Sequence, residues 1–179
     1  YNECLILYIL AASSPTYPIS AEVYHKGWAG SGAINTRSGK YGYTLTLKHN
    51  GSEEYGGPLF WAHYSYLGLD PENLKDKYAD YWQHNKNQTL INWKWCSLNP
   101  KNYAGYSSVC WGLTAGYSVK FYAAHSPGEI NDLGVISPTA ALSSIPYTPV
   151  HSMDALKHFY YDLGFKIWGE YGFYDGFSE

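Results

Sequence analysis

Three places in this 179-residue chain pair a helix-capping residue with a proline, and they constrain the fold more than any other feature. The pairs are Asp70-Pro71, Ser137-Pro138 and Thr148-Pro149. A capping side chain accepts an orphan backbone N–H, and proline supplies a preset φ where its missing donor does no harm. We therefore expect a helix to begin at each pair, which favours a mainly α fold.

Apolar periodicity extends two of these starts into long helices. After Asp70, apolar residues recur at helical spacing and predict a helix over 70–95, although its middle is polar. After Thr148, a second stripe predicts a helix that ends at Gly164, the usual residue type just past a helix. Further helices are expected at 2–12, 21–29, 58–67 and 138–145.

Strand signals are weak by comparison. Residues 41–47 alternate well enough for one strand, reached through the turn-rich stretch 36–40, which predicts a single small β-hairpin. The remaining loops, at 30–57, 99–136 and 168–179, are long and rich in Gly, Tyr and Trp. Long ordered loops beside regular helices usually carry function. No linker or repeat divides the chain, so we expect residues 1–179 to belong to one domain.

Charge and hydropathy exclude several classes of protein. Twelve Lys and Arg against fifteen Asp and Glu give a net charge of −3, which leaves no basic surplus to neutralise a phosphate backbone, so we expect no nucleic-acid partner. The longest apolar run, Leu5 to Ala12, is far shorter than the ~20 residues that span a bilayer. The sequence therefore predicts no membrane span.

Aromatic residues make up 18% of the chain, and Tyr and Trp (20 and 7) far outnumber Phe (6). Both Tyr and Trp combine a flat apolar face with a hydrogen-bonding edge, a combination that suits the ring faces and hydroxyls of a sugar. The alternative interpretation is a tyrosine-rich core and interface. Composition alone does not decide between them.

The three cysteines, Cys4, Cys96 and Cys110, leave at least one thiol unpaired. A Cys96–Cys110 disulfide is one option that the sequence does not establish. No His or Cys group has zinc-ligand spacing, and no phosphate-cradling glycine loop is present, so we expect neither a metal nor a cofactor.

Carboxylates are the first candidates for chemistry. Glu3 opens an apolar helix without a basic neighbour, which suits a general acid; the alternative is a glutamate favoured by the helix dipole. Glu170 and Asp175 flank four residues, three of them aromatic, that could grip a sugar ring, or they form a packed turn. Asp132 reads as ordinary loop chemistry.

Histidines are the second candidates. His125 lies in the longest loop and could hydrogen-bond a sugar hydroxyl. A single histidine among aromatics is more often structural, and this is our interpretation of His63, His84 and His158.

At this point the chain resembles a known family, the bacterial glucoamylase-like (glycoamylase) domain. The resemblance rests on blocks that follow one another over essentially all 179 residues. The blocks are Asn2-Glu3-Cys4-Leu5, Gly56-Gly57-Pro58-Leu59-Phe60, Leu67-Gly68-Leu69-Asp70-Pro71, Cys110-Trp111-Gly112-Leu113-Thr114, Ile136-Ser137-Pro138-Thr139-Ala140-Ala141-Leu142 and Trp168-Gly169-Glu170-Tyr171-Gly172-Phe173-Tyr174-Asp175. The chain departs from the family at Ala115-Gly116, where relatives commonly have Ala-Ser.

The resemblance implies a fold of paired helices closed into an (α/α)6 barrel. It implies an inverting endo-β-1,2-glucanase, a glycoside hydrolase acting on glucan. The acidic residue of the family's Asn-Glu-Cys motif maps onto Glu3, which we expect to be catalytic. We assign the sugar contacts to Trp111, His125, Glu170, Tyr171 and Tyr174 as a hypothesis.

The family's second acidic pair lies on an earlier helix that has no counterpart here. We therefore expect the chain to be the C-terminal portion of the barrel, with its N-terminal half as a missing partner, and expect the fragment alone to be inactive. The base would come from that pair or act through a substrate hydroxyl. Because relatives mostly carry export signals, the resemblance also implies a periplasmic or secreted protein.

Three alternatives to hydrolysis stay open. A non-catalytic carbohydrate-binding module would use the same aromatics without placed carboxylates. A glucan transglycosylase, related to cyclic β-1,2-glucan synthesis, would share the linkage and differ in the reaction. A structural or interaction protein would bury and ion-pair Glu3 and Glu170.

Overall fold

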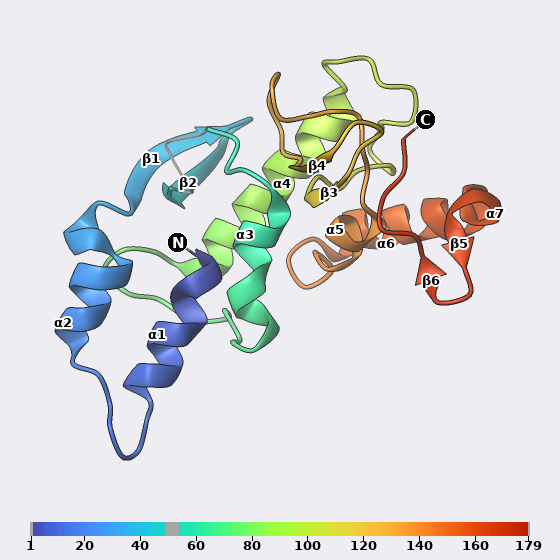
Figure 1. The fold of residues 1–179 in the computed structure, drawn as a ribbon. Coiled ribbons are helices and arrows are strands. Elements are labelled where there is room, and N and C mark those ends of the chain that lie inside the picture. The colour runs from blue at the N-terminus through green and yellow to red at the C-terminus, as the bar shows by residue number, and fades with distance from the viewer. Residues whose placement is uncertain (1, 49–53, 179) are drawn as a thin grey trace.

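The computed structural model describes residues 2–48 and 54–178 and is mainly helical, with a few short strands (Figure 1). The helices and helical turns are η1 (Asn2–Cys4), α1 (Leu5–Ala12), α2 (Ala21–Val23), η2 (Tyr24–Trp28), η3 (Gly30–Gly32), α3 (Leu59–His63), η4 (Tyr64–Leu67), α4 (Tyr81–Leu98), α5 (Pro138–Leu142), α6 (Pro149–Lys157), η5 (His158–Asp162) and α7 (Gly164–Ile167). The expected fold class, mainly α and part of an (α/α)6 barrel, is confirmed. No helix in the described ranges is long and apolar enough to cross a membrane.

Over residues 2–48 and 54–178 the strands form three separate two-stranded antiparallel sheets rather than the one predicted hairpin. They are β1 (Asn35–Lys40) with β2 (Tyr43–Leu47), β3 (Ala115–Tyr117) with β4 (Tyr122–Ala124), and β5 (Trp168–Gly169) with β6 (Gly172–Phe173). The turn-rich stretch before the predicted strand is itself strand β1, because Tyr41 and Gly42 both adopt positive φ and close a two-residue hairpin turn.

Helix α4 runs through the middle of the molecule (Figure 1). It begins at Tyr81 because the Asp80 carboxylate accepts the backbone N–H of Gln83 at 3.0 Å, and it ends where Asn99 adopts a left-handed conformation. The prediction that this helix starts at Asp70-Pro71 was wrong. The Asp70 carboxylate instead accepts the N–H of Glu72 at 2.9 Å, and this local turn replaces the first helical turn.

The predicted helix over 148–163 is also interrupted. Helix α6 continues into the π-helical turn η5, and Gly164 begins the short helix α7 instead of ending the segment. The other four predicted helices are present; two of them end in a π or 3-10 turn, and the helix at 2–12 begins with a 3-10 turn.

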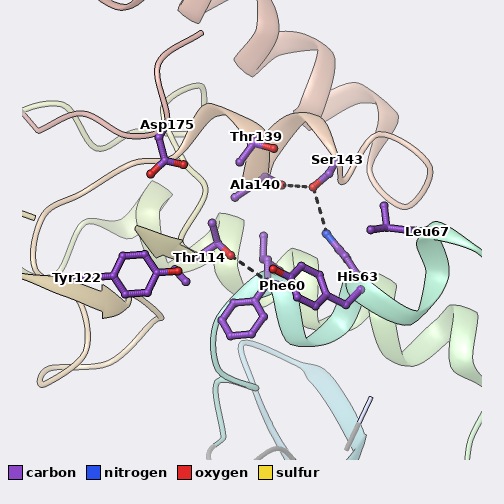
Figure 2. A pocket seen from close by; sticks show the side chains of 12 residues that line it. Phe60, His63, Leu67, Thr114, Tyr122, Thr139, Ala140, Ser143 and Asp175 are labelled. Carbon is purple, nitrogen blue, oxygen red and sulfur yellow. Dashed lines mark hydrogen bonds between the residues drawn. The ribbon is translucent and has the colours of Figure 1, made fainter. Parts of the chain in front are cut away.

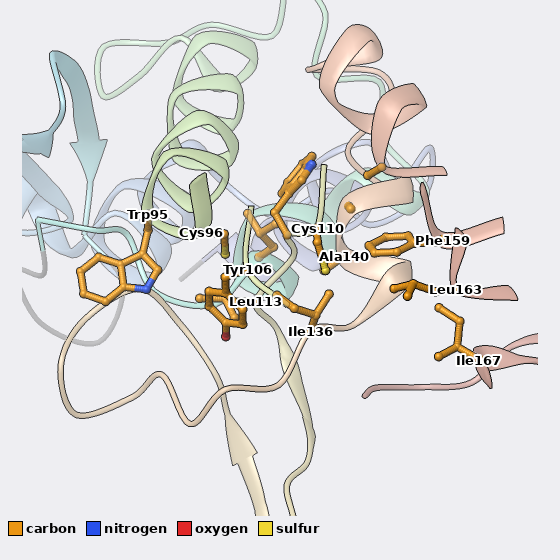
Figure 3. Packing of buried hydrophobic residues seen from close by; sticks show 14 residues of the cluster. Trp95, Cys96, Tyr106, Cys110, Leu113, Ile136, Ala140, Phe159, Leu163 and Ile167 are labelled. Carbon is orange, nitrogen blue, oxygen red and sulfur yellow. The ribbon is translucent and has the colours of Figure 1, made fainter. Parts of the chain in front are cut away.

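Two apolar clusters pack on different parts of α4. The first contains Trp95, Cys96, Cys110, Trp111 and neighbours from α5, α6 and η5. Figure 3 shows Cys110, Ala140 and Phe159 close together in this cluster. The second gathers around Trp28 and joins α1, η2 and β2. All three cysteines are free, and Cys96 and Cys110 are buried thiols, so the optional disulfide does not form.

Between these clusters α4 buries polar side chains. The amides and the hydroxyl of Asn85, Gln88, Thr89 and Asn92 have no exposed surface. Buried polar groups are stable when they are hydrogen-bonded. Gln88 and Asn92 bond to the backbone of neighbouring segments. Asn85 donates to the Tyr147 hydroxyl, and the Thr89 hydroxyl lies 3.5 Å from a ring nitrogen of His63. The polar side chains in the middle of α4 therefore hold neighbouring segments in place by hydrogen bonds.

Candidate active site

Hydrogen bonds connect three helices, α3, α4 and α5, to the segment 112–114. The Asn92 side chain donates to the carbonyl of Leu113 at 3.1 Å and accepts its N–H at 3.0 Å, which pairs both backbone groups of a fully buried residue. The N–H of Leu59, at the start of α3, also donates to the Leu113 carbonyl at 3.1 Å. One residue later, the Thr114 hydroxyl accepts the N–H of Phe60 at 3.2 Å. Helices α3 and α4 are thus fixed to this segment.

Helix α5 approaches the same segment at Gly112. Gly112 has φ +126°, and a Cβ there would lie 2.8 Å from the carbonyl oxygen of Ser137. The N–H of Ser137 donates to the Gly112 carbonyl at 2.9 Å. Only glycine allows this close approach, which brings the start of α5 beside α3.

These ties enclose a cavity of about 350 Å³ between α3, η4, β3, β4, α5 and the C-terminal segment (Figure 2). Its wall combines aromatic rings, hydroxyls, one imidazole and one carboxylate. The lining residues are Leu59, Phe60, His63, Tyr64, Leu67, Thr114, Ala115, Tyr122, Thr139, Ala140, Ser143 and Asp175. Asp175 is the sole acid among them, and none is a lysine or arginine.

Asp175 is held at the cavity by its neighbours in the chain. The N–H of Tyr174 donates to the carbonyl of Ile167 at 2.9 Å, and Phe177 exchanges two backbone hydrogen bonds of 2.9 Å with Ile136. Asp175 lies between these anchors, and its exposed carboxylate points toward the cavity in Figure 2. A carboxylate on a wall of rings and hydroxyls can accept a proton from a bound water or sugar hydroxyl.

His63 lies at the wall as a neutral ring. Burial lowers its pKa to about 4, because charging the imidazole would place a cation away from water. Its Nδ1 lies 3.2 Å from the Ser143 hydroxyl, and its ring stacks on Tyr147 with centroids 5.4 Å apart. His63 therefore shapes the cavity, which agrees with its structural interpretation from the sequence.

Glu3 lies in η1, whose residues pack against α3 and η4, the elements that supply Phe60, His63, Tyr64 and Leu67 to the cavity. The N–H of Ile6, in the first turn of α1, donates to the Ser65 hydroxyl at 3.3 Å and helps to fix this contact. The Glu3 side chain is exposed and does not line the cavity itself. The structure thus places Glu3 in a turn that packs against two elements of the cavity, outside the cavity wall.

Glu170, Tyr171 and Tyr174 lie at the β5–β6 hairpin and away from the cavity wall. Tyr171 is 96% exposed, and Tyr174 is 58% exposed with its ring over Gly169. In Figure 1 this hairpin extends beyond α6 on the far side from the N-terminus. The structure does not bring these predicted sugar contacts together with Glu3.

Trp111 and His125 are fully buried and line no part of the cavity. The Trp111 ring belongs to the first apolar cluster, and its Nε1 donates to the carbonyl of His151 at 3.3 Å. Burial lowers the pKa of His125, and interactions with the backbone of Gly116 and Asn131 partly oppose this shift. Neither ring has exposed surface that a sugar could contact.

The sequence suggested that Asp132 is an ordinary loop residue, but in the structure its carboxylate is fully buried. It accepts hydrogen bonds from the Tyr106 hydroxyl at 2.6 Å and the Trp95 indole at 2.7 Å. It is a structural anchor for the long loop. Within the described residues, no group of three or more His, Cys, Asp or Glu side chains could hold a metal ion.

Sequence reasoning missed Thr114, Tyr122, Thr139 and Ser143, and named Asp175 only as a neighbour of Glu170. The available signal was the position of Thr114 at the end of the Cys110-Trp111-Gly112-Leu113-Thr114 block and of Asp175 at the end of an aromatic loop. Tyr122 and Ser143 carried no distinctive local pattern.

Comparisons with known proteins agree with this architecture. The model of the Glycoamylase family ("Putative glucoamylase") matches residues 1–179. The chain is 68% identical, with a TM-score of 0.96, to an endo-β-1,2-glucanase from Chitinophaga pinensis solved with sophorotriose and glucose; it is covered completely and spans 43% of that chain.

Two relatives come from Parabacteroides distasonis. A solved β-1,2-glucanase is 41% identical with a TM-score of 0.89, covering 99% of this chain and 27% of its own. A curated exo β-1,2-glucooligosaccharide sophorohydrolase (non-reducing end) is 42% identical, covering 99% of this chain and 26% of its own length. The chain therefore spans less than half the length of these relatives.

Proposed function

Because the chain belongs to the Glycoamylase family, we propose that the protein carrying it is a glycoside hydrolase that cleaves β-1,2-linked glucan. The relatives named for this linkage share 41–68% of its residues. The finer proposal is endo-hydrolysis with inversion. The assignment of an activity to the whole protein rests on relatives that are more than twice as long as this chain.

The observation that carries the proposal is the composition of the cavity wall. Phe60, Tyr64 and Tyr122 offer ring faces, and Thr114 and Thr139 offer hydroxyls. Ring faces and hydroxyls suit the two kinds of surface on a pyranose. Asp175 adds a single carboxylate to this wall, which is the group that glycoside hydrolysis needs.

In the proposed reaction, two carboxyl groups divide the proton transfers. An acid donates its proton to the glycosidic oxygen as the C–O bond breaks, and a base takes a proton from the water that attacks the anomeric carbon. We assign the acid to Glu3, in η1, which packs against two elements of the cavity, and the base to Asp175, in the C-terminal segment that lines it. The base can act on the water directly or through a sugar hydroxyl.

Hydrolysis of linear β-1,2-glucan by the full-length protein tests this function. We expect short β-1,2-oligosaccharides, with an α-anomer at each new reducing end in early NMR spectra. Glu3→Gln should lower kcat about 10²–10⁴-fold, the usual cost of losing one acid catalyst. If Glu3→Gln keeps most of the activity, Glu3 is not the acid.

The same assay separates the alternatives. Glucan binding without any cleavage would favour a carbohydrate-binding module, and larger or cyclic products would favour a transglycosylase. Glu3 and Glu170 are both exposed in the chain, which is not what an interaction protein that ion-pairs and buries them would have.

The chain is further proposed to be the C-terminal portion of a longer barrel domain. It spans 43% of the glucanase from C. pinensis, and its helix α1 leaves Leu7 and Leu10 63% and 59% exposed. Helix α1 also borders an apolar groove of about 310 Å³. A preceding half of the domain would cover these side chains. Urea unfolding of the chain alone and of the full-length protein tests this: covering α1 should raise the stability of the same residues.

A periplasmic or secreted location is proposed from the family resemblance alone. Fractionation of the producing cells, with antibody detection of the full-length protein, tests it, and recovery only with cytoplasmic markers would contradict it.

A further inference from the structure

A second hollow borders the cavity and has no part in the proposed reaction. It is a groove of about 420 Å³ between residues 66–71, the first turn of α4 and the turn that follows α5. Its wall contains the rings of Trp82 and Tyr147 and the carboxylate of Asp70. We call it the Trp82 groove and define it by Leu67, Asp70, Trp82 and Tyr147.

The Trp82 groove and the cavity share part of their walls. Leu67 lines both hollows, and the same two stretches of chain supply residues to both, 63–71 on one side and 139–147 on the other. The Leu67 side chain is 83% exposed, and Figure 2 shows it at the opposite side of the cavity from Tyr122 and Asp175. The groove therefore continues the cavity past Leu67, at the end away from Asp175.

A row of contacting rings leads from the cavity wall into the groove. The ring of His63, in the cavity wall, stacks on Tyr147 with centroids 5.4 Å apart and an interplanar angle of 20°. Tyr147 in turn contacts Trp82, with centroids 5.0 Å apart at 50°. His63 and Tyr147 are buried, and the Asn85 side chain donates to the Tyr147 hydroxyl at 3.3 Å, so the inner part of the row is fixed. Trp82 is only half-buried and keeps part of its ring accessible.

Asp70 adds polar contacts to this groove. Its Oδ1 accepts the N–H of Glu72 at 2.9 Å, which fixes the direction of an exposed carboxylate. An ionised carboxylate offers about four acceptor sites on its two oxygens, so most of its capacity stays available to hydroxyl donors. Among the described residues that line the groove, Asp70 is the only charged one. An anionic ligand would meet a like charge there, whereas a neutral ligand with hydroxyls and a ring face fits both kinds of surface.

We propose that the Trp82 groove binds a further glucosyl residue of the same β-1,2-glucan chain that is cleaved in the cavity. The chain passes over Leu67, a sugar ring packs on Trp82, and its hydroxyls donate to Asp70. The inference rests on the proposed function and adds a binding subsite that takes no part in proton transfer. Because only chains that extend past Leu67 reach the groove, it gives the enzyme a preference for long chains over short ones.

Chain-length dependence tests the proposal. The full-length protein is assayed on linear β-1,2-glucooligosaccharides of increasing length and on the long polymer. Trp82→Leu removes the ring, so we expect kcat/KM to fall about 2–10-fold on long chains and to stay unchanged on the shortest chains that are cleaved. The unchanged rate on short chains also shows that the variant is folded. Trp82→Phe keeps a ring face and should recover most of the loss.

Asp70→Asn tests the polar side of the groove. Asparagine keeps an oxygen that accepts the Glu72 N–H, so the local turn is retained, but the charge that strengthens hydrogen bonds from sugar hydroxyls is lost. We expect a decrease of about 2–10-fold in kcat/KM, again confined to long chains. A decrease of equal size at every chain length would contradict a role for Asp70 in the groove.

Trp93→Leu is the matched control. Trp93 lies on the same helix α4, is half-buried like Trp82, and stacks on His151 with centroids 3.9 Å apart, but it lines neither hollow. Its loss should lower stability in urea and leave the ratio of kcat/KM on long and short chains unchanged.

The outcomes separate this inference from the function beneath it. If the unaltered protein cleaves no β-1,2-glucan of any length, the proposed function is wrong and the subsite falls with it. If the unaltered protein cleaves the glucan but Trp82→Leu keeps the same ratio between long and short chains, the function stands and the subsite is overturned. A preceding half of the domain that fills the groove would give this second result, with Trp82→Leu lowering only the stability of the full-length protein.

Discussion

The part of the cavity wall that Asp175 forms and the β5–β6 hairpin are close in sequence, but their surroundings differ. Glu170 is at the turn of the hairpin and exposed, whereas Asp175, five residues later, lines the cavity. The difference comes from the backbone pairing of Phe177 with Ile136, which draws the end of the segment to the start of α5. Two acids that flank the same aromatic residues thus differ in position, and the long-range backbone pairing places only Asp175 at the cavity.

Replacing the two acids gives the largest expected contrast. Asp175→Asn should lower kcat on β-1,2-glucan about 10²–10⁴-fold, as expected for a lost acid or base catalyst. Glu170→Gln is the matched control and should change kcat less than about twofold, in line with surface substitutions away from a site. Steady-state kinetics of the full-length protein measure both. A larger loss for Glu170→Gln would reverse the comparison.

The rigidity of the cavity wall gives the second contrast. Asn92→Leu should destabilise the protein by about 2–3 kcal/mol, because the buried N–H of Leu113 loses its partner. Asn87→Ala is the control on the same helix, since its side chain is only half-buried; it donates to the Thr44 carbonyl and accepts from the exposed Gln83 side chain. Urea unfolding compares the two, and equal losses would mean that the Asn92 bonds do not hold the wall.

Local signals predicted most helices and misplaced one start. The sequence pattern of a capping residue before proline is present at both Ser137 and Asp70. At Ser137 a helix follows, but at Asp70 the carboxylate bonds the N–H two residues later and Asn73 adopts φ +64°. Both outcomes satisfy the same local chemistry. Tertiary packing decides between them, and a single sequence does not contain that information in readable form.

The sequence predicted the kinds of side chain in the candidate site, aromatic rings and carboxylates, but not which individual residues line it. The sequence pointed to aromatic residues and carboxylates in long loops, and four residues of the cavity wall lie in those loops: Thr114, Ala115, Tyr122 and Asp175. The family motifs covered Thr114 and the segment up to Asp175. The choice of Asp175 over Glu170 depends on hydrogen bonds between Ile136 and Phe177, which are 41 positions apart. Trp111 was expected to face a sugar, but its size and apolar neighbours place it in the core.

Acidity should weaken the α3–α4 core around the wall. Burial lowers the pKa of both His63 and His84 to about 4, and the N–H of Thr46 donates to Nδ1 of His84, which requires a neutral ring. The unfolded chain binds these protons near pH 6.5, before the folded one does. Stability is therefore complete above that pH and falls toward pH 4, by up to about 1.4 kcal/mol per pH unit for each histidine.

Urea unfolding between pH 7 and pH 4 measures this slope. His63→Gln should reduce it by the share of one histidine, because glutamine does not titrate. Burial lowers the pKa of His125 and His151 as well, so part of the slope should persist in this variant. An unchanged slope in His63→Gln would mean that the ring at the cavity wall is hydrated or charged in the folded protein.

Tyrosines on the two regions give the smallest and most discriminating contrast. Tyr171, on the hairpin, is 96% exposed, whereas Tyr122, 58% exposed on β4, lines the cavity and packs edge-on against Tyr117 with centroids 5.1 Å apart. Tyr171→Ser should change stability by less than about 0.5 kcal/mol and leave kcat and KM nearly unchanged. Tyr122→Ser should raise KM, because a sugar would lose a ring face. If the KM for long glucans rises with Tyr171→Ser and not with Tyr122→Ser, the hairpin binds the polymer and the cavity does not.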